Sequence, residues 1–220
     1  MKLWQIMGEL QTIFSPKIAE EWDNVGLLVG DNTREINKVL FCLDVTEKAV
    51  QKAVDNNVDL IISHHPVIFS GLKKITNETV HGRKILKLIE NKIAVYSIHT
   101  NSDFAINGLN DFIMDKLNLD GEKVIFNEHE FEDYNPIKNQ MEHVRGGLAR
   151  IKILNEKMKL GDLIERIKDS LGISYVRYVG NKNSYVRKIG LVTGGGSSFM
   201  YEVANKIDVF LTGDLRYHEA

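Results

Sequence analysis

The sequence predicts an α/β protein: a mainly parallel sheet flanked by helices, with a smaller strand–helix–strand lobe. Short apolar runs that suit buried strands alternate with amphipathic segments that suit helices. This alternation is typical of parallel strands joined by helical crossovers. It is interrupted over residues 127–143, which lack a clear period, and resumes after a shorter unit. The interruption therefore separates a main domain from an inserted lobe.

Five apolar runs are predicted to form the main sheet. They are residues 38–44, 59–63, 93–98, 188–193 and 208–212. Helical spacing of apolar residues predicts helices over residues 2–14, 79–90 and 107–119, and a further helix that Thr46 can cap.

The lobe is predicted as strand 147–153, helix 159–171 and strand 174–180. The main domain then comprises residues 1–126 with 186–220, and the inserted lobe comprises residues 127–185.

Composition excludes several classes of protein. The chain has 220 residues, is 43% hydrophobic and 26% charged, and carries a formal net charge of −2. Nucleic-acid binding is not indicated, because it needs a basic face. No apolar run approaches the roughly 20 residues of a membrane span. A single cysteine excludes an intrachain disulfide. We expect a cytoplasmic protein without a membrane partner.

Two adjacent histidines, His64 and His65, end the apolar run 59–63. Neighbouring side chains in a regular strand point to opposite faces, so the pair can converge only where the strand stops being regular. Pro66 supplies that break, because it cannot donate to a ladder and restricts the residue before it. Two imidazoles at a strand-to-loop corner indicate a transition-metal site. The alternative is a structural role in capping or buried hydrogen bonds.

Chemically active residues follow the other predicted strands as well. Asp44 follows the first, His99 and Asp103 follow the third, Gly194–Gly196 follow the fourth, and Asp214 follows the fifth. If these strands are parallel, all of them lie at the carboxyl edge, where open α/β sheets place their ligand sites. The glycine run matches no nucleotide fingerprint. It is either a tight turn or, with the following helix, an anion site.

The residue types predict roles within a hydrolytic metal centre. His64, His65 and Asp103 are the predicted metal ligands, and His99 and Asp214 are predicted to orient or move a proton. His99 can also serve a structural role, and Asp103 can instead cap a helix. Asp44 is open to the same alternative of helix capping.

Several segments together resemble one family. They are Trp22–Leu27, Leu43–Thr46, Ser63–Pro66, His99–Asp103 and Leu211–Ala220. This chain resembles the Nif-three-like family (NGG-interacting factor three), whose members are often called GTP cyclohydrolase type 2 homologues. The resemblance runs over nearly the whole chain.

The resemblance implies a site for two divalent metal ions facing the inside of a ring-shaped homohexamer. Residue by residue, His64, His65 and Asp103 match the family's N-terminal ligands. Zinc, iron and manganese all suit such donors. The family completes the site with a Gly-His-x-x-x-Glu motif that does not occur before Ala220. We therefore expect an incomplete site in this chain, which is either truncated or missing its tail.

Two functions are compatible with these observations. The first is a metal-dependent hydrolase acting on a nucleotide or phosphoester-type small molecule. The alternative is a non-catalytic metal-binding or regulatory ring-shaped assembly. Trp4, Phe69 and Phe199 are large apolar residues near loops or termini, to be covered either by a neighbouring subunit or within their own. Trp22 is predicted to lie in the core.

Overall fold

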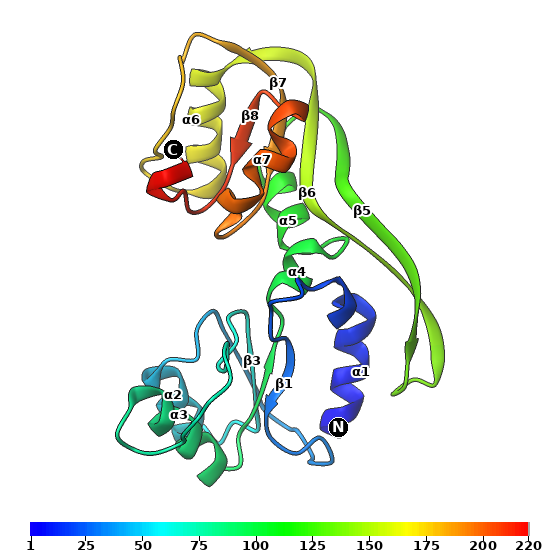
Figure 1. Ribbon diagram of the computed structural model, residues 1–220, viewed down its shortest axis with the longest axis vertical. Coiled ribbons are helices and arrows are strands. Elements are labelled where there is room, and N and C mark those ends of the chain that lie inside the picture. Colours follow the sequence, from blue (N-terminus) through cyan, green and yellow to red (C-terminus); the bar gives the residue numbers. More distant parts are fainter. Residues whose placement is uncertain (220) are drawn as a thin grey trace. The chain divides into compact units, whose positions relative to one another are not determined.

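The computed structural model describes residues 1–219 and confirms the α/β class, with two mixed four-stranded sheets and helices (Figure 1). The chain forms two compact units. The first comprises residues 1–102 and 131–144, and the second comprises residues 103–130 and the chain from residue 145 onward. These boundaries differ from the predicted division into residues 1–126 with 186–220 and residues 127–185.

The first unit contains four short strands and the helices around them. Its elements are α1 (Leu3–Ile13), η1 (Pro16–Ile18), β1 (Gly26–Val29), β2 (Val39–Cys42), α2 (Glu47–Asp55), β3 (Leu60–Ser63), α3 (Val80–Glu90) and β4 (Ala94–Ser97). Helix α4 (Thr100–Phe104) follows directly after β4. The strand order is β1-β4-β3-β2. Strands β2, β3 and β4 are parallel, and β1 is antiparallel to β4. The carboxyl ends of β2, β3 and β4 therefore share one edge.

Alternating side chains give this sheet two apolar faces. Leu60 and Ile62 pack in one cluster with residues of α1, whereas Ile61 and Val95 pack in another with residues of α2 and α3. Figure 1 shows α1 on one side of the sheet and the α2–α3 pair on the other. The continuous apolar run in β3 is explained by this burial on both faces.

The second unit holds the longer strands. Its elements are α5 (Leu109–Lys116), β5 (Gly121–Asn135), β6 (Gln140–Lys159), α6 (Leu160–Leu171), β7 (Tyr185–Leu191), η2 (Gly196–Phe199), α7 (Met200–Val203), η3 (Ala204–Lys206), β8 (Val209–Leu211) and η4 (Tyr217–Glu219). The order is β5-β6-β7-β8, with β6 and β7 antiparallel and β7 and β8 parallel. The distal parts of β5 and β6, residues 131–135 and 140–144, belong to the first unit.

Three predictions about the fold were wrong. The five predicted strands do not form one sheet, because 188–193 and 208–212 belong to the second sheet. Residues 174–180 form no strand, and α6 is instead followed by irregular backbone. Residues 127–143, whose lack of a clear period predicted a loop or crossing segment, lie in β5 and β6 apart from the turn at 136–139. Their side chains are mostly exposed, so the segment carries no apolar alternation to reveal it.

No helix within residues 1–219 is both long and apolar enough to cross a membrane.

Candidate metal centre

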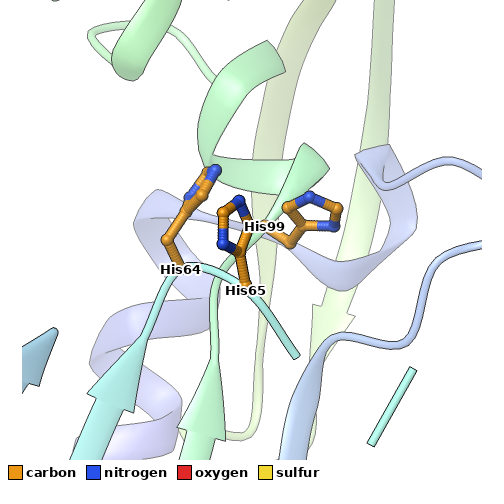
Figure 2. Close-up of side chains that lie close together, drawn as sticks. All are labelled: His64, His65 and His99. Carbon is orange, nitrogen blue, oxygen red and sulfur yellow. The ribbon is translucent and has the colours of Figure 1, made fainter. Parts of the chain in front are cut away.

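Three histidines converge at the carboxyl edge of the first sheet. His64 and His65 follow β3, and His99 follows β4, the parallel neighbour of β3. Each offers one ring nitrogen, and these atoms all lie within 4.8 Å of one another (Figure 2). The ring centroids are 5.0 to 5.6 Å apart. We call this set the imidazole cluster.

His99 is held by a buried carboxylate. Its Nδ1 lies 2.8 Å from Asp23 Oδ1, and the Asp23 side chain is fully buried. The other oxygen of Asp23 accepts from the Thr100 backbone N–H at 3.0 Å and from the Thr100 hydroxyl. Because a carboxylate only accepts hydrogen bonds, His99 Nδ1 carries the proton. His99 Nε2 is then left with its lone pair.

The other two imidazoles are fixed in the same way. His64 Nδ1 lies 3.0 Å from the Ile98 carbonyl, and His65 Nδ1 lies 2.8 Å from Asp44 Oδ1. Both partners are acceptors, so both Nδ1 atoms donate, and Nε2 of each ring is the remaining nitrogen. A metal-binding histidine generally donates its other ring N–H to a carboxylate or carbonyl in this manner.

The environment of His64 favours its neutral form. The pKa of His64 is lowered to about 4, mainly by burial and also by the nearby imidazoles of His99 and His65, which together outweigh the Ile98 carbonyl and the Asp23 charge. Burial alone would raise the pKa of Asp23, but hydrogen bonds from His99 and Thr100 outweigh it and lower that pKa to about 2. At neutral pH the cluster therefore presents a lone pair on His64 beside an ionised Asp23.

The donor set fits a divalent transition metal. Three imidazole nitrogens are a common protein ligand set of catalytic zinc, and imidazole also suits iron. The orientation of each ring is fixed by its Nδ1 bond rather than by the metal. The cluster can therefore hold a metal ion on residues of the first unit.

The remaining predicted site residues lie in the second unit. Asp103, predicted as a metal ligand, is buried on α4, and Thr193 Oγ1 donates to its Oδ1 at 3.3 Å. Asp214, predicted to move a proton, is exposed in the loop after β8, where its backbone N–H donates to the Gly194 carbonyl at 2.9 Å. Both roles stay predictions.

Two interpretations of individual residues change. Asp44 does not cap α2, because the Thr46 side chain accepts from the Ala49 N–H there, and Asp44 binds His65 instead. Trp22 is not in the core: it is 54% exposed, and its ring lies against His99.

Asp23 is a residue of the candidate site that the sequence pattern does not reveal. It belongs to the segment Trp22–Leu27, which contributed to the resemblance, but it follows no predicted strand of the parallel sheet. Its role depends on a contact with His99, 76 positions away in the sequence. The clustering of polar residues at strand ends therefore could not reveal it.

Comparison with known proteins gives a consistent result over the whole chain. The family model described as Duf34/NIF3 (NGG1p interacting factor 3) matches residues 1–220. A Clostridium perfringens relative named GTP cyclohydrolase 1 type 2 homolog is 37% identical over 99% of this chain and 79% of its own length. The Schizosaccharomyces pombe protein NIF3 homolog is 32% identical over 96% of this chain and 74% of its own.

Solved structures agree with the fold. The Staphylococcus aureus protein SA1388 has a TM-score of 0.83 and 30% identity, covering 100% of this chain and 81% of its own. A Bacillus cereus protein related to NIF3 has a TM-score of 0.83 and 25% identity, covering 100% and 84%. Reduced HcgD from Methanocaldococcus jannaschii has a TM-score of 0.72 and 30% identity, covering 100% and 81%.

Proposed function

The chain belongs to the Duf34/NIF3 family, and from that premise we propose that it is a metal-dependent hydrolase of a nucleotide or phosphoester-type small molecule. The observation that carries this proposal is the imidazole cluster, in which each Nδ1 contacts an acceptor and one nitrogen of each ring lies within 4.8 Å of the others. The name of the curated relatives, GTP cyclohydrolase 1 type 2 homolog, supports a nucleotide as the substrate class.

The cluster would hold the ion through His64 and His65, with His99 beside them. A bound divalent ion supplies a lowered pKa for water and a positive charge that polarises a carbonyl or phosphoryl oxygen. The proposal includes a second ion, with Asp103 as a carboxylate ligand, as the family resemblance implies.

His99 is suited to hold or move a proton at Nε2. Its Nδ1 proton is fixed on Asp23, so Nε2 is the only ring atom at which it can accept another. We propose Asp214 as a further group that orients or transfers a proton.

Hydrolysis tests the proposal directly. The purified chain, loaded in turn with zinc, manganese and iron(II), is assayed against GTP and bis-p-nitrophenyl phosphate. We expect turnover in at least one metal form. In His64→Gln, metal content and turnover should fall together, by roughly 100-fold or more in rate, because a ligand is lost.

His143→Gln is the matched control. His143 is an exposed histidine that pairs with Glu132 at 3.3 Å and is not part of the cluster. It should keep wild-type metal content and rate. Metal binding without turnover in any metal form would contradict the hydrolase and favour the alternative, a non-catalytic metal-binding or regulatory assembly.

A further inference from the structure

Two large aromatic rings lie beside the imidazole cluster and are only half covered. Trp22 is 54% exposed and Phe69 is 51% exposed. Their ring centroids are 5.9 Å apart with an interplanar angle of 48°. Both rings also contact His99, with centroid distances of 6.1 Å from Trp22 and 6.4 Å from Phe69. A molecule engaged at the cluster would therefore lie next to these two rings.

The segments that carry the two rings are fixed to each other and to the sheet edge. Asp23, next to Trp22, is bound by His99 and Thr100. The Asn24 side chain donates to the Ile68 carbonyl at 2.6 Å, and Ile68 immediately precedes Phe69. These hydrogen bonds are made by residues directly next to Trp22 and Phe69 in the sequence. The pair is therefore preorganised rather than carried on a free loop.

About half of the apolar surface of Trp22 and Phe69 stays in contact with solvent, so the first unit does not gain the hydrophobic stabilisation of burying it. Each aromatic side chain has roughly 150–250 Å² to bury, and here about half of it is already covered. The remaining area is far below the roughly 800 Å² that each partner contributes to a standard protein interface. The exposed area of the two rings instead suits contact with one face of a small planar ring. Apolar walls with a few convergent polar groups are the usual composition of small-molecule sites.

We propose that Trp22 and Phe69 form a stacking platform for a planar heterocyclic ring of the substrate, of nucleobase size. This rests on the proposed function, since it places the substrate of that site. Aromatic faces prefer to stack on flat π-systems, and stacking of one base on a protein aromatic ring is sequence-tolerant but sensitive to loss of that ring. The platform would orient the substrate, while the imidazole cluster provides the chemistry.

Binding of a matched pair of probes tests the platform. GMP and ribose 5-phosphate share the sugar phosphate and differ in the base. The chain has two tryptophans, so Trp4→Phe leaves Trp22 as the only indole reporter. In the zinc-loaded Trp4→Phe protein we expect GMP to quench Trp22 fluorescence. Calorimetry should show GMP binding about 10-fold more tightly than ribose 5-phosphate.

Two substitutions at Trp22 separate stacking from simple apolar contact. Trp22→Leu keeps an apolar side chain without a planar face, and we expect it to abolish the roughly 10-fold preference for GMP. Trp22→Phe keeps a face and should retain most of it. Zinc affinity should be unchanged in both variants, since leucine and phenylalanine, like Trp22, supply no metal-ligand atom. Equal affinity for the two probes, no measurable GMP binding, or an unchanged preference in Trp22→Leu would overturn the platform.

The test is independent of turnover. GMP preference without hydrolysis of any compound would support the platform and count against the hydrolase. Hydrolysis without any preference for GMP over ribose 5-phosphate would support the hydrolase and overturn the platform. If Trp22→Leu instead lowers the particle mass in light scattering, the aromatic pair is a contact between copies of the chain, and the platform is overturned.

Discussion

At the scale of single residues, the same chemical pair occurs twice in the site, in two environments. Asp23 binds His99 Nδ1 and Asp44 binds His65 Nδ1, each at 2.8 Å. The Asp23 side chain is fully buried, whereas the Asp44 side chain is 56% exposed. Solvent screens the second pair and weakens it, so the two carboxylates should differ in their effect on the histidine that each holds.

Replacing Asp23 should weaken metal binding more than replacing Asp44. Asp23→Asn keeps the shape but removes the charge, and it directs an N–H against the Thr100 donors. We expect zinc affinity to fall about 10–100-fold, as for other outer residues that orient the groups around a metal site. Asp44→Asn should cost only a few-fold. Competition titrations with a chromogenic chelator measure both.

A structural readout completes this comparison. Histidine side-chain ¹⁵N NMR should show His99 protonated at Nδ1 in the wild type and a mixture of tautomers in Asp23→Asn. Equal zinc affinities for the two variants, or an unchanged His99 tautomer, would show that Asp23 does not position the ring.

The proximity of His64 and His65 could be predicted because it depends on local rules. A proline and the end of a buried strand act within a few residues of the pair. Asp23 and the exposure of Trp22 could not be predicted in this way. Both depend on which distant segment returns to the sheet edge, and a large aromatic residue in one sequence looks the same whether it is buried or exposed.

At the scale of elements, two helical glycines have opposite surroundings. A Cβ on Gly82 of α3 would lie 2.0 Å from the Thr76 carbonyl oxygen, whereas a Cβ on Gly161 of α6 would have no neighbour closer than 3.4 Å. Gly82→Ala should therefore destabilise the protein by about 1–3 kcal/mol, as overpacking does. Gly161→Ala should be neutral or stabilise it by up to about 1 kcal/mol through helix propensity.

Denaturant unfolding of the two variants checks this. The midpoint should move down for Gly82→Ala and should stay or move up for Gly161→Ala. A Gly82→Ala protein as stable as the wild type would mean that the backbone around Thr76 adjusts freely.

A buried ion pair joins α5 to β6. Arg150 is fully buried and donates to Asp111 Oδ2 at 2.9 Å and to the carbonyls of Phe104 and Ala105. Burial raises the pKa of Asp111, but hydrogen bonds from Arg150 and Lys123 outweigh it and bring that pKa below its ordinary value of 3.8. Ionised Asp111 thus stabilises the folded chain above that pH.

Asp111→Asn should cost roughly 3–5 kcal/mol at pH 7, because it leaves the buried Arg150 charge uncompensated. The cost should shrink as the pH falls below 3.8 and through the lower pKa of folded Asp111, where the folded wild-type carboxylate also becomes protonated. Unfolding curves at several pH values measure it. Asp115→Asn is the control on the same helix, because Asp115 is exposed, and it should cost under about 1 kcal/mol.

The predicted elements were more accurate than their pairing. Helix 79–90 corresponds to α3 (Val80–Glu90) and begins after Thr79, whose side chain accepts from the Gly82 N–H. Helix caps and the spacing of apolar residues depend only on nearby positions, so they can be recognised in the sequence. The assignment of 188–193 to the second sheet depends on its pairing with residues 150–153 of β6, a contact between distant segments that no local pattern encodes.

At the scale of the whole molecule, we propose a homo-oligomer, with a hexameric ring as the form that the family resemblance implies. Of the apolar residues considered for a subunit contact, Trp4 is 40% exposed, Phe69 belongs to the proposed platform, and the Phe199 ring packs on Phe104 with centroids 6.3 Å apart. Phe199 is thus already covered in part within its own unit. Multi-angle light scattering at micromolar concentration should give about six times the 25.0 kDa of one chain. A particle of 25.0 kDa would contradict the proposal.

The two units are not consecutive in the sequence, since residues 131–144 return to the first unit after residues 103–130 have joined the second. In the first unit they contact α1: Asn135 Nδ2 donates to the Gly8 carbonyl at 3.1 Å, and the Thr12 hydroxyl donates to Glu142 at 2.8 Å. A ribosome must therefore release residue 144 before the first unit has all its parts. For the same reason, no single crossover between two genes can separate the units, because any crossover point that keeps one unit whole divides the other. The two units should therefore be inherited together.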